Sequence, residues 1–275
     1  MPGNGVRKMK PPFSSPGGKA RLAPILTRLY PEHQVYIEPF SGAASCLFAK
    51  EPRGDEWLND WDEGIVAVHT WLRDTSPADL QQWATHPDWV FTEAMYEKSG
   101  RKAQNRGEVA RRWLIRRKGS FMHRDGYMAK TKVGKNISPG KIVLDWHKRL
   151  RNVRVTQGDG LKVIQENDRP GVLFFLDPPY PGVVNQWSHY TMKDIQALID
   201  ALDKLKHADW LYAETPNVME MVPATWEYVM LEHVAPSYNG KRRKHQEVVY
   251  GSASVLDRAD RYGLSKGGTD FVSQD

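Results

Sequence analysis

The sequence predicts a mixed α/β fold, in which a mostly parallel sheet with helical crossovers is split by an inserted basic module. Short apolar segments alternate with helical patterns over residues 35–84 and again from residue 153, the order expected of parallel strands joined by helices. Residues 172–176, Val-Leu-Phe-Phe-Leu, form a continuous apolar run, as expected of a central strand buried on both faces. Between residues 86 and 149 the alternation stops, and the chain becomes polar, basic and rich in glycine.

The first half of the sheet is expected before the insert. Gly17-Gly18 opens a helical pattern over residues 19–30, and Val35-Tyr36-Ile37 is a short strand of β-branched and aromatic residues. The other elements expected here are a helix over residues 43–50, a strand over 56–58 and helices over 62–73 and 77–84.

One clear helix is expected in the insert, over residues 108–118. Val109 and Trp113 are four residues apart and share one face, while Arg112 and Arg116 form a parallel basic row. Gly119 follows directly and is typical of a helix C-cap.

The second half of the sheet is expected after the insert. Its elements are strands over residues 153–156, 172–176 and 210–213, a helix over 192–205, and two alternating segments near 226–234 and 246–250. The two alternating segments flank a basic stretch at residues 238–244, Tyr-Asn-Gly-Lys-Arg-Arg-Lys, which predicts a terminal hairpin with a basic tip.

These patterns divide the chain into four parts. Residues 1–12 lack periodicity and are expected to form a flexible leader, and residues 256–275 are polar and expected to fray. Residues 13–85 and 150–255 together form one discontinuous sheet domain, and residues 86–149 form the insert. A sheet of this kind would bind a cofactor, and the insert would grip a second substrate.

Composition excludes several classes of protein. No run of about 18 apolar residues exists, so we expect no membrane span. The N-terminus lacks the apolar region of a secretory signal. The single cysteine, Cys46, leaves no internal disulfide, and the nine histidines show no metal-ligand spacing. We expect a cytoplasmic protein without a structural metal.

Positive charge is concentrated in and around the insert. Residues 101–154 carry 17 Lys or Arg and three acidic residues, a net of +14, whereas the whole chain sums to +6. Such asymmetry is the footprint of a surface that meets a polyanion. A solvated basic face, or an arm for anionic lipid, is the alternative. Aromatic residues interleaved with the charges, such as Trp113 and Tyr127, favour nucleic acid.

The tetrapeptide Asp177-Pro178-Pro179-Tyr180 follows the apolar strand directly, where open α/β sheets bind ligands. The two prolines stiffen the backbone and remove two amide donors, so carbonyl groups remain as the available polar groups. A carboxylate and a carbonyl can accept both N–H bonds of an exocyclic amine, while the tyrosine ring stacks on the base. The amine nitrogen could then attack a methyl sulfonium in line. The alternative is a Pro-Pro turn with a capping aspartate.

A second group of residues is typical of a nucleotide-like ligand. Residues 38–45, Glu-Pro-Phe-Ser-Gly-Ala-Ala-Ser, end the first strand and open a helix, where a small residue lets the backbone approach a ligand. The Gly-x-Gly-x-x-Gly pattern is absent, which disfavours an oxidoreductase. Asp60 is placed to take ribose hydroxyls, Trp61 to pack on adenine and Asp159 to accept from its amino group. The alternatives are an ordinary strand–helix turn for residues 38–45 and a capping or turn role for each acid. Lys19, at the start of a helix, indicates an anionic partner such as a cofactor carboxylate.

Four segments together carry a family resemblance. They are residues 12–19 (Pro-Phe-Ser-Ser-Pro-Gly-Gly-Lys), residues 38–45, Leu58-Asn59-Asp60, and Asp177-Pro178-Pro179-Tyr180. Over about residues 12–250 the chain resembles the Dam-like family of DNA adenine methyltransferases, in the branch whose target-recognition module lies between the cofactor and catalytic motifs. The resemblance implies a Rossmann-like methyltransferase sheet with an inserted, mostly helical target-recognition module. It also implies S-adenosylmethionine as the cofactor and flipping of the target base.

By this resemblance, Ser15 and Lys19 would contact the methionine end of the cofactor, Asp60 its ribose and Asp159 its adenine. The candidate catalytic residues are Asp177, Pro178, Pro179 and Tyr180. The candidate cofactor-binding residues are Ser15, Gly17, Lys19, Glu38, Pro39, Phe40, Gly42, Ser45, Asp60, Trp61, Asp159, Gly160 and Asp177. The candidate DNA-binding residues are Arg112, Arg116, Arg117, Lys118, Arg124, Lys130, Lys132, Asn239, Lys241, Arg242 and Arg243.

The chain departs from the family at two places. Ser15 stands where the family usually has an aromatic residue. Residues 117–124, Arg-Lys-Gly-Ser-Phe-Met-His-Arg, replace its usual Asn-rich run, so the common GATC target is not carried over.

Other functions stay open at this point. The same amine-holding chemistry would serve the cytosine 4-amino group or adenine in RNA, and a catalytically silent DNA-binding module is a third alternative. We expect double-stranded DNA as the partner, no membrane, and a monomer, with a transient dimer as the alternative. Restriction–modification in a bacterial or phage-infected cell is the expected setting.

Overall fold

A computed structural model describes residues 9–14, 17–120, 127–180, 190–236, 242–267 and 269–271. These residues form one eight-stranded sheet in the order β3-β2-β1-β4-β5-β7-β6-β8. The strands are β1 (Val35–Glu38), β2 (Asp55–Asp60), β3 (Val153–Gln157), β4 (Val172–Leu176), β5 (Asp209–Glu214), β6 (Tyr228–Pro236), β7 (Arg242–Gly251) and β8 (Thr269–Phe271).

The first five strands of the sheet order are parallel, and β7 joins β5 in the antiparallel direction. In the centre, Ile37 of β1 pairs with Trp57 of β2 on one side and with Phe174 of β4 on the other. The predicted α/β fold is therefore confirmed. β6 and β7 pair antiparallel from Tyr228 opposite Tyr250 to Pro236 opposite Arg242, which confirms the terminal hairpin. Its tip, residues 237–241, lies outside the described residues.

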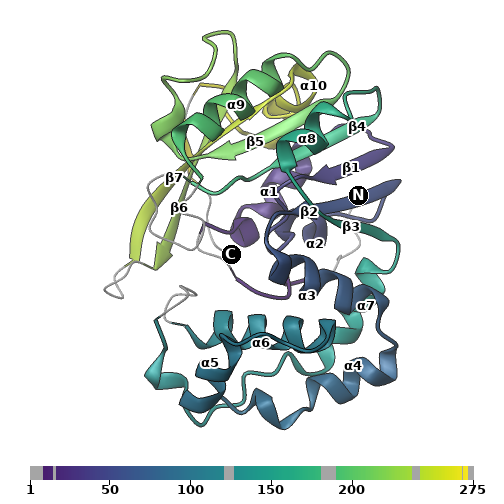
Figure 1. Cartoon of the computed structure of the whole chain (residues 1–275). Helices are drawn as coiled ribbons and strands as arrows, with labels where there is room; N and C mark the ends of the chain where they lie inside the picture. The colour runs from purple at the N-terminus through teal and green to yellow at the C-terminus, as the bar shows by residue number, and fades with distance from the viewer. Residues whose placement is uncertain are drawn as a thin grey trace.

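Helices cover both faces of the sheet (Figure 1). They are α1 (Ala23–Leu26), α2 (Ser45–Ala49), α3 (Glu63–Asp74), α4 (Pro77–Ala84), α5 (Glu93–Ser99), α6 (Arg106–Gly119), α7 (Val143–Leu150), α8 (Gly160–Gln165), α9 (Met192–Asp203) and α10 (Ala253–Leu256). The segment predicted as a helix over residues 19–30 is α1 flanked by two 3-10 turns, Lys19–Arg21 and Thr27–Leu29.

The side chains of β4 divide between two cores. Leu173 and Phe175 join the larger core, which includes α1–α3 and the insert, whereas Phe174 and Leu176 join the core under α8 and α9. Every residue of β4 is buried. This explains the continuous apolar run, because neither face of the strand meets water.

The insert packs on α3 through α6, on the side of α3 remote from α8 and α9 (Figure 1). Two glycines allow the close approach of these helices. A Cβ at Gly64 would lie 1.8 Å from the Trp113 ring, and one at Gly107 would lie 2.6 Å from the Trp71 ring. The insert holds α5 and most of α7 in addition to the one helix expected. Both were missed because they are short and their apolar residues pack only on tertiary neighbours.

Gly119 requires a correction. The sequence predicts it as the C-cap of the helix, but it is the last residue of α6, and Ser120 is the C-cap. A Cβ at Gly119 would lie 2.1 Å from the Phe91 ring. The glycine is therefore needed for close packing.

The two chain ends also differ from expectation. In the tail, expected to fray from residue 256, Leu256 and Ala259 are fully buried, and β8 pairs with β6. In the leader, the backbone carbonyl of Lys10 accepts a 2.8 Å hydrogen bond from Trp146 Nε1. Buried apolar side chains, a strand pairing and a hydrogen bond thus hold parts of segments whose overall composition is polar.

Candidate active site

A cavity of about 380 Å³ opens at the carboxyl ends of the parallel strands. It is lined by every residue proposed for the cofactor or for catalysis except Ser15, which lies outside the described residues. These are Gly17, Lys19, Glu38, Pro39, Phe40, Gly42, Ser45, Asp60, Trp61, Asp159, Gly160, Asp177, Pro178, Pro179 and Tyr180. Segments that are far apart in the sequence therefore meet in one hollow. The role of each residue stays a prediction.

The turn after β1 is fixed by the end of β2. Ser41 N–H donates to the Asn59 carbonyl at 2.9 Å, and Gly42 N–H donates to Asp60 Oδ2 at 2.8 Å. Gly42 has a φ of +47°, a left-handed conformation that favours glycine. His69 of α3 makes a 2.8 Å hydrogen bond to the Gly42 carbonyl, and burial lowers the pKa of His69 to about 4. The turn is thus held from both sides.

Asp60 ends β2 with both carboxylate oxygens engaged. Oδ2 accepts from Gly42 and Oδ1 accepts from Asp62 N–H at 3.0 Å. Burial raises the pKa of Asp60 to about 6, although these two donors oppose the shift. Each carboxylate oxygen has two lone pairs, so acceptor capacity remains for a ligand hydroxyl. Next to it, the Trp61 side chain is 67% exposed at the mouth of the cavity.

Part of the cavity wall is aromatic. A Cβ at Gly160 would lie 2.7 Å from the Phe40 ring, so only glycine fits there. Phe40 meets Tyr190 edge to face at 6.1 Å, and Tyr190 also lines the cavity, which the sequence reasoning missed. Asp159 caps α8 by accepting from Leu161 N–H at 2.9 Å, so the capping alternative holds for this residue, whether or not it also binds a ligand.

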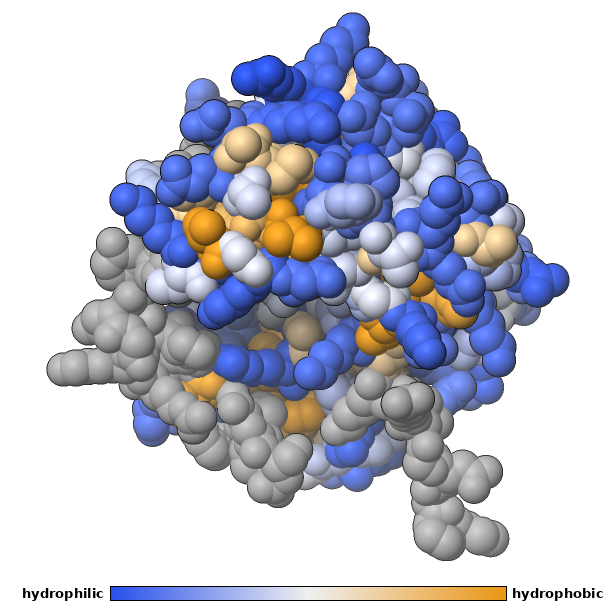
Figure 2. Space-filling view, turned by 90° about the horizontal axis from the view of Figure 1, so that it is seen from below, coloured by the Kyte–Doolittle hydropathy of each residue, from blue (hydrophilic) through white to orange (hydrophobic). Residues whose placement is uncertain are grey.

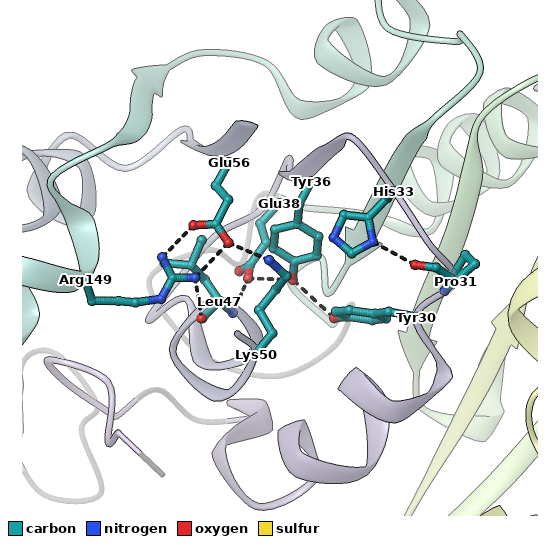
Figure 3. Close-up of polar contacts among 9 residues, drawn as sticks. All are labelled: Tyr30, Pro31, His33, Tyr36, Glu38, Leu47, Lys50, Glu56 and Arg149. Carbon is teal, nitrogen blue, oxygen red and sulfur yellow. Dashed lines mark hydrogen bonds and ion pairs between the residues drawn. The ribbon is translucent and has the colours of Figure 1, made fainter. Parts of the chain in front are cut away.

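Glu38 lines the cavity, and hydrogen bonds from neighbouring groups hold it in place (Figure 3). Its Oε1 accepts 2.8 Å hydrogen bonds from the Tyr36 hydroxyl and from Leu47 N–H. Its Oε2 is buried, and no hydrogen-bond partner for it exists among the described residues. Burial raises the pKa of Glu38 to about 8. An unsatisfied buried acceptor that lines a cavity is suited to a donor on a ligand.

Beside Glu38, an ion-pair network ties the end of the insert to the sheet (Figure 3). Arg149 of α7 donates from both terminal nitrogens to the carboxylate of Glu56, at 2.5 and 2.8 Å, and also to the Leu47 carbonyl at 2.8 Å. Lys50 donates to the same carboxylate at 2.5 Å. Arg149 and Glu56 thus join α7, β2 and α2.

Asp177 stands at the end of β4 and is paired with Lys19. The Lys19 ammonium donates to Asp177 Oδ1 at 2.6 Å, to the Gly17 carbonyl at 2.8 Å and to the Tyr180 hydroxyl. Burial alone would lower the pKa of Lys19, but the carboxylates of Asp177 and Glu247 outweigh it and raise the pKa. The expected contact of Lys19 with a cofactor carboxylate stays a prediction. All three of its N–H donors are engaged by protein acceptors.

Tyr180 is bound through its hydroxyl to a residue that sequence reasoning missed. The hydroxyl donates to Glu247 Oε2 at 2.7 Å, and the same oxygen lies 3.6 Å from the Lys19 ammonium. Glu247 is 7% exposed on β7. Its position two residues before Val249, on the inward face of a strand, was the only available signal. Glu214, at the end of β5, is fully buried, and burial raises its pKa to about 8.

Much of the predicted basic row of α6 is engaged inside the insert. Arg112 donates to the carbonyls of Arg101 and Lys102 and pairs with Glu108 at 2.5 Å. Arg116 lies over the Tyr96 ring.

Of two further α6 residues, one is buried and the other is partly buried. Arg117 is 3% exposed and lies over the Trp113 ring, so burial keeps its side chain from a phosphate, and its assignment as a DNA contact is corrected. Lys118 donates to the Ile137 carbonyl, and burial lowers its pKa to about 8.

The remaining candidates for DNA binding fall into three groups. Lys130 is exposed, and Lys132 donates to the Lys118 carbonyl. Arg242 and Arg243 begin β7. Arg124, Asn239 and Lys241 lie outside the described residues.

The underside of the molecule, where the insert lies, is mainly hydrophilic, with small apolar patches between charged residues (Figure 2). Within the described part of the chain, no helix has the length and apolar character needed to cross a bilayer. The same residues contain no cluster of three or more side chains arranged to hold a metal ion.

The decisive comparison concerns the first third of the chain, which carries Lys19, the turn after β1 and Asp60. Residues 15–104 match the D12 class N6 adenine-specific DNA methyltransferase family. Over these residues the match supports the predicted relationship and an adenine-specific DNA methyltransferase. No curated protein matches this chain in sequence.

Several solved structures are similar to this chain at low identity. A methyltransferase from Geobacter sulfurreducens is 11% identical, with 87% of this chain and 80% of that chain covered and a TM-score of 0.37. The rRNA methyltransferase aviRa from Streptomyces viridochromogenes is 15% identical, with 93% of each covered and a TM-score of 0.36. The type IIG restriction endonuclease BpuSI is 10% identical, with 90% of this chain and 26% of that one covered and a TM-score of 0.39. TM-scores this low identify neither substrate nor target.

Proposed function

We propose that this methyltransferase transfers a methyl group from S-adenosylmethionine to the exocyclic amino group of adenine within specific sequences of double-stranded DNA. One observation carries the proposal. The amine-accepting motif at the end of β4 and the ligand-binding turn after β1 line the same cavity. A methyl donor and a flipped base could therefore meet there.

The residues present fit the proposed cofactor. S-adenosylmethionine carries a positively charged amino group, a ribose and an adenine. Glu38 Oε2, which lacks a partner among the described residues, would accept from the amino group. Asp60 would hold the ribose, and Phe40, Trp61 and Asp159 would surround the adenine. When bound, the cofactor supplies a methyl group on a positively charged sulfur.

The chemistry proposed for this chain is acceptance and orientation of the amine. Asp177 Oδ1 is taken by Lys19, while Oδ2 accepts no hydrogen bond from the described residues. Oδ2 and the Pro178 carbonyl would accept the two N–H bonds of the target amine and hold its nitrogen toward the methyl group. Hydrogen bonds to a charged acceptor strengthen as positive charge develops on the nitrogen. The methylated amine is acidic and then releases its proton.

Access to the amine requires base flipping, because the adenine amino group is paired inside the duplex. Extrusion costs a few kcal/mol, which hydrogen bonds at the base edge and stacking on Tyr180 would offset. Residues 13–85 and 150–255 would form the catalytic domain and residues 86–149 the target-recognition insert. We propose that this enzyme acts in the cytoplasm, where it meets DNA; the monomeric state and the link to restriction stay predictions.

Transfer of labelled methyl groups tests this function directly. The enzyme is incubated with S-adenosylmethionine carrying a labelled methyl group and with duplex DNA of mixed sequence or RNA, and the nucleosides are then separated. We expect label in N6-methyladenine from DNA only. Label in N4-methylcytosine or in RNA would replace the proposed substrate, and DNA binding without any label would indicate a silent module. Brightening of 2-aminopurine at the target adenine, once mapped, would report flipping.

A further inference from the structure

We propose that Glu247 is a positioning residue that accepts the hydrogen bond of the Tyr180 hydroxyl and thereby keeps Asp177 available to the target amine. This inference rests on the proposed function. Glu247 does not line the cavity, so it acts through Tyr180.

The hydrogen bonds around Tyr180 have only one consistent direction. The Lys19 ammonium is a donor without acceptor capacity, so the Tyr180 oxygen accepts from it. The hydroxyl has one proton, and two carboxylate oxygens compete for it. Glu247 Oε2 lies at 2.7 Å, whereas Asp177 Oδ1 lies at 3.3 Å. The shorter distance directs the proton to Glu247.

Loss of this acceptor would redirect the proton. Without Glu247, the Tyr180 hydroxyl would turn to Asp177, which already accepts from Lys19. A second donor on the carboxylate would disperse its charge and weaken its bond to the incoming amine. A carboxylate that accepts strongly is what the transfer step needs. Glu247 thus prevents the Tyr180 hydroxyl from competing with the substrate amine for the Asp177 carboxylate.

The position of Glu247 adds a second consequence. It lies on β7 opposite Leu231 of β6, three residues after Lys244, in the strand that begins at the basic end of the hairpin. Lys19 and Tyr180 come from a turn near the N-terminus and from the end of β4. The Glu247 carboxylate therefore joins the hairpin that carries candidate DNA-binding residues with the motif proposed to hold the base.

The test removes the acceptor while keeping the volume. Glu247→Met should lower the single-turnover rate at saturating cofactor by at least about tenfold, the range of one hydrogen bond to a charged group. The melting temperature and cofactor affinity should stay near those of the wild type. Glu247→Gln, which keeps a neutral acceptor, should retain an intermediate rate. Glu227→Gln, at an exposed ion pair with Lys266, is the matched control and should leave the rate unchanged.

The decisive measurement adds Tyr180→Phe. This change removes the hydroxyl proton itself, so the double variant Tyr180→Phe with Glu247→Met should lose little activity relative to Tyr180→Phe and should exceed Glu247→Met alone. Equal losses on adding Glu247→Met to the wild type and to Tyr180→Phe would assign Glu247 a packing role and overturn the proposal. A wild-type rate in Glu247→Met would do the same. Absence of methyl transfer by the wild type would instead refute the proposed function.

Discussion

The ammonium of Lys19 lies 2.6 Å from Oδ1 of Asp177, although the two residues are 158 positions apart. The pair is largely buried, with side-chain exposures of 1% and 20%. Close opposite charges in such a site stabilise each other's ionised forms. Lys19 therefore favours the charged form of the Asp177 carboxylate before any base arrives.

Lys19→Met should reduce methyl transfer and move the acid limb of its pH–rate profile to higher pH. Burial raises the pKa of Asp177, and the Lys19 ammonium opposes that shift. Without the ammonium, Asp177 takes up a proton at a higher pH and the rate falls earlier on acidification. Single-turnover rates from pH 5 to 9 measure this, with Lys204→Met at an exposed site as control. A lost cofactor affinity with an unchanged pH–rate profile would contradict this role and favour the predicted contact of Lys19 with the cofactor.

Asp177→Asn should nearly abolish transfer while DNA affinity is kept. The amide loses the charge and presents a donor, whereas phosphate contacts dominate DNA binding. A loss of at least about a hundredfold is expected for a group that stabilises developing charge. Asp55→Asn, exposed at the start of β2, is the matched control. Near-normal transfer by Asp177→Asn would remove this residue from the mechanism.

Asp60→Ala should weaken S-adenosylmethionine binding without unfolding the sheet. A ligand selective for the native state raises the melting temperature by mass action, so the cofactor-induced shift should shrink in the variant. Because the pKa of Asp60 is raised to about 6, wild-type affinity should also fall as pH drops through that value. Calorimetric titration measures both effects. An unchanged affinity would refute the ribose contact.

Glu38→Gln should make the cofactor-free enzyme more stable at pH 8.5 and little different at pH 4.5. The folded state holds the Glu38 proton up to about pH 8, whereas the unfolded chain releases it near the ordinary value of 4.5. Stability is therefore lost as pH rises between these values, by up to a few kcal/mol. Denaturant unfolding at several pH values detects this slope. A slope equal to that of the wild type would contradict the raised pKa.

Substitutions of two basic residues of the insert should affect different properties of the protein. Lys130→Glu, on the surface, should weaken binding to all DNA sequences and flatten the salt dependence by roughly one unit per lost phosphate contact. Arg117→Met, at a buried site, should act on folding stability instead. Salt titrations and thermal melts separate the two. If both variants changed the salt dependence of DNA binding equally, the difference in burial between Lys130 and Arg117 would be contradicted.

Features of the fold and the site that depend on short-range sequence patterns could be predicted from the sequence. The run in β4 and the placement of Asp60 and Asp177 at strand ends follow from local pattern and the geometry of parallel sheets. Glu247 could not be found this way, because its partner Tyr180 is 67 residues away and only the strand order makes them neighbours. Arg117 had the sequence context of a surface cation, yet its burial depends on Trp113 and on the approach of α3. The Gly119 packing against Phe91 was hidden for the same reason.

The Arg149–Glu56 ion pair has a consequence for module exchange. The expected boundary of the insert falls at residue 149, inside α7, where Arg149 is bonded to β2 and α2. A graft that replaced residues 86–149 would remove Arg149, the ion-pair partner of the buried Glu56 carboxylate. Among the described residues, Lys50 would then be the remaining ion-pair partner of Glu56. Chimeras should therefore be joined before Val143, so that α7 travels with the recipient. Altered sequence preference could then be transplanted without melting the acceptor scaffold.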